Sequence, residues 1–78
     1  MEYKEAKDKS LNVLWKAVPC FTGESCWCRV VEPIEPIYYD DGGQTEVEII
    51  SAGSIGKAEA EHIVSIHNKY IENKFAQE

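Results

Sequence analysis

Two tryptophans, a tyrosine and an arginine in the first half of the chain have the chemistry to hold a flat, charged ligand. Trp15, Trp27, Arg29 and Tyr38 all occur in short segments rich in β-forming residues. Aromatic rings stack on bases or on partner side chains, and a guanidinium adds positive charge beside them. If the first two segments pair as a hairpin, we expect the tryptophans to be neighbours. The four residues are candidate ligand-binding residues, and the alternative is that both tryptophans are core.

The segment from Ser51 to Lys57, SAGSIGK, has the composition of a phosphate-binding loop but not its pattern. A Walker loop requires Gly at the position of Ser51, and Ser or Thr at the position of Ala58. A Gly/Ser-rich loop that opens a helix still offers backbone N–H groups and the positive end of the helix dipole to an anion. Ser54, Gly56 and Lys57 are therefore candidate phosphate-binding residues, and an ordinary helix cap is the alternative.

His67 lies in the middle of the apolar face of a predicted helix. A histidine at such a position is either a hydrogen-bonded core residue or the floor of a small-ligand pocket, and we include it among the candidate ligand-binding residues. His62 is expected to face solvent. The two residues project about 140° apart around a helix axis, so they cannot bind one metal ion together.

The cysteines Cys20, Cys26 and Cys28 are an odd number, which does not suit a closed disulfide framework. With a histidine they have the ligands of a Cys₃His zinc site. Cys26 and Cys28 have one residue between them, whereas the usual zinc knuckles have two to four residues between two cysteines in a turn. We expect small buried apolar side chains, with no metal and no cofactor. Metal binding and a redox role are the alternatives.

Composition argues against several classes of function. The net charge of −6 opposes nonspecific binding to nucleic acid or to anionic lipid. No apolar run is long enough to span a bilayer, and the charged N-terminus is not a secretory signal, so we expect a cytoplasmic protein. The sequence contains no Ser-His-Asp arrangement and no paired carboxylates in an evident pocket, which predicts that the protein is not an enzyme.

The elements that must position these residues are short strands followed by one helix. Strand-forming composition marks residues 11–21, 26–32, 37–39 and 44–51. Pro19 ends the first strand or places it at an edge, and residues 40–43, DDGG, form the clearest turn. Residues 52–56 are expected to be the loop into the helix, with Ser54 or Gly56 as its N-cap.

The helix is predicted over residues 57–75, because apolar residues recur there at helical spacing: Ala60, Ile63, Val64, His67, Ile71 and Phe75. We expect residues 1–10 to form a tail or a marginal helix, and residues 11–78 to form one domain. The predicted fold class is α+β, an antiparallel sheet of three or four strands packed against one C-terminal helix.

Three short motifs occur in the same order as in a known group of proteins. They are a Trp-led strand with a nearby proline, WKAVP at residues 15–19, a second strand with an aromatic, CWCRVV at 26–31, and a helix, AEHIVSIHN, at 60–68. Together they resemble short accessory proteins of tailed phages and prophages, over most of residues 13–71. That group includes small anti-defence proteins, which block host immune complexes or sequester nucleotide immune signals. The Pro33–Pro36 connector and the acidic fourth strand depart from the pattern.

The residues and the resemblance lead to one preferred function and two alternatives. The preferred function is a non-enzymatic phage anti-defence protein of the host cytosol that binds and sequesters a small nucleotide-type immune signal. A homo-oligomer would supply the pocket walls that one small chain lacks. The first alternative is an acidic inhibitor or adaptor that binds a host defence protein through Glu32, Glu35, Asp40, Asp41, Glu46 and Glu48. The second is a structural phage component.

Overall fold

The computed structural model describes residues 2–20 and 25–76, and the chain forms two sheets and two helices within them. The elements are α1 (Tyr3–Ser10), β1 (Trp15–Pro19), β2 (Cys28–Pro33), β3 (Tyr38–Asp40), β4 (Gln44–Glu46), β5 (Ile50–Gly56) and α2 (Lys57–Ala76). The molecule is flat, with extents of 40 × 35 × 16 Å. No helix in the described part of the chain is long and apolar enough to cross a membrane.

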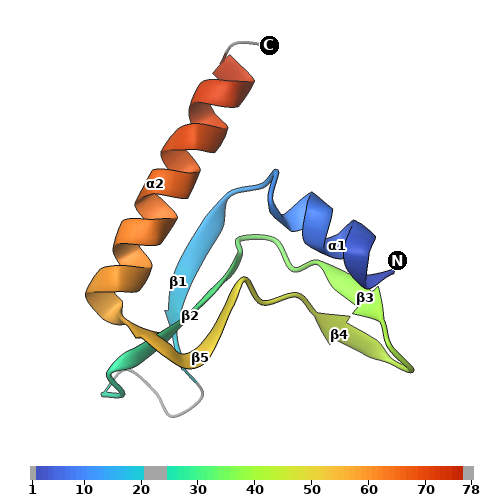
Figure 1. Cartoon of the computed structure of the whole chain (residues 1–78), viewed down its shortest axis with the longest axis horizontal. Helices are drawn as coiled ribbons and strands as arrows, with labels where there is room; N and C mark the ends of the chain where they lie inside the picture. Colours follow the sequence, from blue (N-terminus) through green and yellow to red (C-terminus); the bar gives the residue numbers. More distant parts are fainter. Residues whose placement is uncertain (1, 21–24, 77–78) are drawn as a thin grey trace.

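The larger sheet is antiparallel, with the strand order β1-β2-β5. Trp15 lies opposite Pro33 and Pro19 lies opposite Arg29, so the predicted hairpin of the first two strands is confirmed. The helix α2 lies against this sheet (Figure 1), where Trp15, Val31 and Ala60 form a buried cluster. The predicted α+β fold, with a three-stranded antiparallel sheet and a C-terminal helix, is confirmed.

The strands β3 and β4 form a second sheet of their own. The turn between them is the predicted DDGG turn, in which Gly42 has φ +104° and its N–H donates to Asp40 Oδ1 at 3.2 Å. This sheet packs beside α1 (Figure 1), and the buried cluster between them contains Ala6, Ile37 and Val47. Of the two predictions for the N-terminal segment, a tail or a marginal helix, the structure has the helix, α1 over Tyr3–Ser10, whose Ala6 is fully buried.

The predicted fourth strand, residues 44–51, is wrong as a single element. Its first part is β4 and its last residues begin β5, because the chain changes partners in between. The N–H of Val47 donates to Ile37 O at 2.8 Å, whereas the N–H of Ile49 donates to Val31 O at 2.8 Å in the other sheet. Ile49 packs against the buried clusters of both sheets and joins them.

The predicted loop over residues 52–56 is also wrong, since these residues belong to β5. The strand pairs with β2 through a bulge: Ile50 lies opposite Val31 and Ile55 lies opposite Arg29, so four residues of β5 span one of β2. Gly53 lies within the bulge at φ +87°, a conformation that favours glycine. A segment of small and polar residues that contains such a glycine has the composition of a loop, which is why the strand was not predicted. The first two strands are shorter than predicted, and the end of the first prediction, residue 21, lies outside the described residues.

The predicted helix is confirmed as α2, but only part of its apolar face is covered. Ala60 and Ile71 are buried, whereas Ile66, Tyr70 and Phe75 are more than half exposed. Figure 1 shows the reason, because the C-terminal half of α2 extends beyond the sheet.

Candidate functional site

Arg29 and Lys57 line one hollow between β2 and the beginning of α2. The alternation of β2 places Arg29 on the same side as Val31, which packs under α2, and Lys57 is the first residue of that helix. The hollow has a volume of about 300 Å³, and its lining residues are Ala17, Arg29, Lys57, Glu61, Val64 and Ser65. We call it the Arg29–Lys57 hollow. It contains two cations and one carboxylate.

The guanidinium of Arg29 is anchored to backbone carbonyls at the start of β2 and in the turn before it. Its Nη1 donates to Cys26 O at 2.7 Å and to Cys28 O at 2.8 Å. Arg29 therefore holds the turn at residues 26–27 in place while its side chain also lines the hollow. A substitution of Arg29 would disturb both features together.

Trp27 lies against Gly56, the residue that precedes α2. Its side chain is 65% exposed. A Cβ built on Gly56 would lie 3.5 Å from Trp27 O and 3.9 Å from Trp27 Cε3, at ordinary van der Waals distances, so Trp27 and Gly56 are direct neighbours. Trp27, Arg29, Gly56 and Lys57 therefore gather at one end of the larger sheet.

The other candidate phosphate-binding residues have different surroundings. The N–H of Gly56 donates to Glu59 Oε1 at 3.2 Å, in one half of a capping box, so this N–H already has a carboxylate partner. Gly56 precedes the first helical residue, which is the N-cap position, whereas Ser54 lies within β5 and is exposed. Of the three candidates only Lys57 lines the hollow.

The expected proximity of Trp15 and Trp27 is wrong. Trp15 begins β1 and lies opposite Pro33, at the end of β2 that is farthest from Trp27. The reason is the antiparallel register, which places the start of the first strand beside the end of the second. Trp15 is only 8% exposed, and its Nε1 donates to Ser10 O at 2.7 Å.

His67 contacts Trp15 rather than the Arg29–Lys57 hollow. The two rings are stacked with centroids 3.4 Å apart, and His67 Nε2 lies 2.7 Å from Val13 O. Because a carbonyl oxygen only accepts, the ring donates from Nε2. This arrangement is that of a hydrogen-bonded core histidine. The pair also borders a shallow apolar hollow of about 420 Å³ with Ile63, Ile66 and Tyr70.

Tyr38 belongs to the other sheet, on β3, and is 45% exposed. It is not one of the residues that line the Arg29–Lys57 hollow. The structure therefore brings together Trp27, Arg29, Gly56 and Lys57 from the predicted set. It separates them from Trp15, Tyr38, Ser54 and His67.

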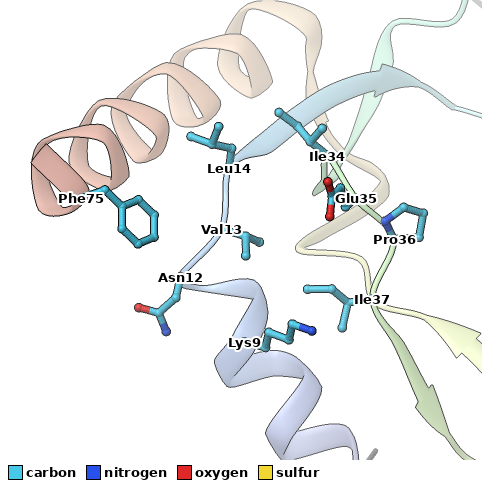
Figure 2. A pocket seen from close by; sticks show the side chains of 9 residues that line it. All are labelled: Lys9, Asn12, Val13, Leu14, Ile34, Glu35, Pro36, Ile37 and Phe75. Carbon is cyan, nitrogen blue, oxygen red and sulfur yellow. The ribbon is translucent and has the colours of Figure 1, made fainter. Parts of the chain in front are cut away.

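A third hollow, of about 300 Å³, lies between the end of α1, the residues before β1 and the Pro-rich connector (Figure 2). Its lining residues are Lys9, Asn12, Val13, Leu14, Ile34, Glu35, Pro36, Ile37 and Phe75. In Figure 2, Phe75 reaches toward it from α2 and Ile37 points into it from the opposite side. Three segments that are distant in the sequence form it, so no local pattern marks it. The stiff Pro33–Pro36 connector is the one signal that the sequence offers.

The three cysteines meet on the side of the larger sheet that faces away from α2. All three are reduced thiols, and their sulfur atoms lie within 4.8 Å of one another. Cys20 and Cys28 are buried with Val30, and Cys26 is half-buried against them. Hydrogen bonds with Cys26 and then Cys20, followed by burial, raise the pKa of Cys28 to about 11. We call Cys20, Cys26 and Cys28 the thiol cluster.

The thiol cluster fits the expectation of small buried side chains in its packing. The Cys₃His alternative lacks its histidine: among the described residues, the group of side chains close enough to share an ion contains the three cysteines and neither His62 nor His67. Comparison of the chain with protein-family models, with curated proteins and with solved structures found no match.

Proposed function

We propose that the chain is a non-enzymatic binding protein for a small phosphate-bearing nucleotide, held at the Arg29–Lys57 hollow. The observation that supports this best is that Arg29 and Lys57, from separate elements, line one hollow, while the exposed indole of Trp27 lies against Gly56, the residue before Lys57. A guanidinium and an ammonium attract phosphate, and an indole offers a face on which a base can stack. The volume of about 300 Å³ is at the lower end of the usual range for ligand pockets.

The carboxylates near the hollow restrict how a phosphate can bind. Glu61 lines the hollow, and Glu59 accepts the Gly56 N–H at the beginning of α2. A phosphate bound by Lys57 and Arg29 would be repelled by the Glu61 carboxylate in the same hollow. This geometry favours a ligand with few phosphate charges close together, such as a mononucleotide or a cyclic nucleotide.

The biological role that we propose is sequestration of a nucleotide immune signal in the host cytosol, as the resemblance to phage accessory proteins implies. Sequestration requires affinity and no chemical step, which agrees with the small size of the hollow. A second copy of the chain would enclose a ligand that one copy leaves partly exposed.

The test is thermal unfolding of the full chain with and without a panel of mono-, di- and cyclic nucleotides. A ligand at about 100 times its dissociation constant adds about 2.7 kcal/mol of stability. For a domain of this size the melting temperature then rises by roughly 10–20 °C. A flat response across the panel would refute nucleotide binding for those compounds.

Three variants locate the ligand once one nucleotide shifts the melting temperature. Lys57→Ala should reduce the shift, because it removes an exposed cation that lines the hollow. Glu61→Gln should increase it, because it removes the nearby negative charge. Lys69→Ala is the matched control on the same helix, since Lys69 is exposed but does not line the hollow. An equal shift in wild type and Lys57→Ala would place the ligand elsewhere.

A second candidate function, binding of a basic host protein, is favoured by the acidic surface around β4. The pKa of Glu32 is raised by burial and by the carboxylates of Glu46 and Glu48, so these acids lie close enough to repel one another. A basic partner would relieve that repulsion, and its association would weaken strongly with added salt. Pull-down from host lysate at low and raised ionic strength, with wild type and Glu46→Gln, tests this; retention that depends on neither would refute it.

A further inference from the structure

We propose that the thiol cluster is a metal site, in which Cys20, Cys26 and Cys28 bind one thiophilic cation, and that this cation is Zn²⁺. The proposal is independent of nucleotide binding. It rests on the convergence of three sulfur atoms from different parts of the β1–β2 region: Cys20 directly after β1, Cys26 in the turn before β2, and Cys28 within β2.

The distances between the sulfur atoms suit a single ion. Cys26 Sγ and Cys28 Sγ are 3.3 Å apart, and all three sulfur atoms lie within 4.8 Å of one another. Zn–S bonds of about 2.3 Å in a tetrahedral site separate the sulfurs by roughly 3.8 Å. The Cys26–Cys28 separation is shorter than this value and no pair of sulfurs is more than 4.8 Å apart, so small side-chain rotations would bring all three to bonding distance of one ion.

The backbone around the thiol cluster is held in a way that favours a preformed site. The guanidinium of Arg29 binds the carbonyl oxygens of both Cys26 and Cys28, and so fixes the segment that carries two of the three sulfurs. Outer contacts of this kind orient metal ligands and tune their basicity.

The choice of metal follows from the ligands. Sulfur-only ligand sets select Zn²⁺, Cu⁺ and related soft ions over Mg²⁺ or Ca²⁺, which prefer oxygen. Cys20 and Cys28 are buried, whereas Cys26 is half-buried. An ion would therefore enter the site from the side of Cys26. Three protein ligands leave a fourth position on Zn²⁺ for water or an outside ligand, as in reactive rather than closed structural sites.

The test uses the full chain, reduced and freed of metal, and titrated with Zn²⁺ against a chromophoric chelator. We expect one Zn²⁺ per chain, confirmed by native mass spectrometry, and a higher melting temperature with the ion bound. Co²⁺ gives a second readout, because tetrahedral Co²⁺ absorbs in the visible and thiolate ligation adds a near-ultraviolet charge-transfer band. That band should fall by about a third when one of three thiolates is removed.

Cys26→Ser is the informative variant, because Cys26 is the least buried of the three and its loss leaves the buried pair intact. Changes to outer contacts alone reduce metal affinity by about 10- to 100-fold, so loss of a ligand should reduce it at least tenfold. Ser25→Ala, in the same turn, keeps all three thiols and should bind as wild type. Far-ultraviolet circular dichroism establishes that each variant is folded.

Three results would overturn the proposal. The first is that the reduced wild-type chain takes no Zn²⁺ from the chelator. The second is folded Cys26→Ser that binds as tightly as wild type, which would place the ion elsewhere. The third is a chain that takes up no metal when reduced but forms a Cys26–Cys28 disulfide in air, which would make the cluster a redox pair.

Discussion

The imidazole of His67 lies flat on the indole of Trp15, with ring centroids 3.4 Å apart and ring planes inclined by only 7°. The same imidazole reaches Val13 O at 2.7 Å, and the next residue, Asn68, binds the backbone of Trp15. Two consecutive residues of α2 therefore attach the helix to the first strand. Although His67 is a candidate ligand-binding residue by its position in the sequence, its contacts are those of a residue that positions α2.

The first prediction concerns Asn68, which bridges the main chain of Trp15. Its Oδ1 accepts the Trp15 N–H at 2.8 Å, and its Nδ2 donates to Trp15 O at 3.0 Å. Asn68→Ala leaves both groups without these partners, which should lower the free energy of unfolding by about 1–3 kcal/mol. In a domain this small, that lowers the melting temperature by roughly 5–20 °C.

Thermal unfolding followed by circular dichroism measures this effect. Asn73→Ala is the matched control, because Asn73 is exposed on the same helix and the same amide is removed. Equal melting temperatures for the two variants would show that the Asn68 bridge contributes nothing to stability.

The parts of the fold that the sequence predicts well depend on local signals. Adjacent Gly42 and Gly43 after two aspartates mark a turn, and Gly42 has the positive φ that such a turn requires. Pro19 lacks an N–H for further pairing, and β1 ends there. The helix α2 begins at Lys57 as predicted, since its apolar spacing and its Glu59 cap are both encoded within a few residues.

The parts that were not predicted depend on contacts between distant residues. The division of residues 44–51 between two sheets follows from Val47 pairing with Ile37, and Ile49 with Val31. Neither partner choice leaves a local pattern. Residues 52–56 have the composition of a loop, yet they belong to β5, which pairs with β2 through a bulge.

The candidate site was predictable in its residue types but not in its membership. Arg29 and Lys57 were both candidates, and the structure brings them to one hollow because β2 passes under the start of α2. Trp15 and Tyr38 were equally good candidates by type, but strand register places them elsewhere. The thiol cluster depends on the turn conformation before β2, which residue spacing alone does not determine.

The second prediction concerns Gly42, whose φ of +104° lies in a region that other residues avoid. An added Cβ meets no atom within 4 Å, so only backbone strain opposes a substitution. Gly42→Ala should lower the free energy of unfolding by about 1 kcal/mol. Gly43→Ala is the control, because Gly43 has equally open space and no positive φ. Denaturant unfolding of both variants measures the difference, and a Gly43→Ala variant as unstable as Gly42→Ala would contradict backbone strain as the cause.

The third prediction concerns Glu32 and pH. Burial, and then the carboxylate of Glu46, raise the pKa of Glu32 despite Lys16 at 3.6 Å. The folded state therefore binds this proton more tightly than the unfolded state. Its contribution to stability is greatest at low pH and is lost as pH rises through the ordinary value of 4.5 toward the higher folded-state pKa.

Glu32→Gln removes this titration and should raise the melting temperature near neutral pH. It should also reduce the change in melting temperature between mildly acidic and neutral pH. Glu72→Gln, an exposed site on α2, controls for the change in net charge. A lower melting temperature for Glu32→Gln near neutral pH would mean that the ion pair with Lys16 outweighs burial and repulsion.

The fourth prediction concerns self-association through the uncovered face of α2. Ile66 is 57% exposed and Tyr70 is 59% exposed, four residues apart on the helix, and both line the shallow apolar hollow beside His67. Covering these side chains with a second copy removes apolar surface from water, which stabilises the association by about 25 cal/mol per Å² of apolar surface buried.

We expect wild type to form a dimer or larger oligomer, measured by size-exclusion chromatography with light scattering. Ile66→Glu should shift it toward monomer, because a carboxylate on this face opposes burial. Asn73→Glu adds the same charge at an exposed polar position and should leave the mass unchanged. A wild-type chain that stays monomeric at every concentration would refute the homo-oligomer, and any nucleotide would then have to bind within one copy of the Arg29–Lys57 hollow.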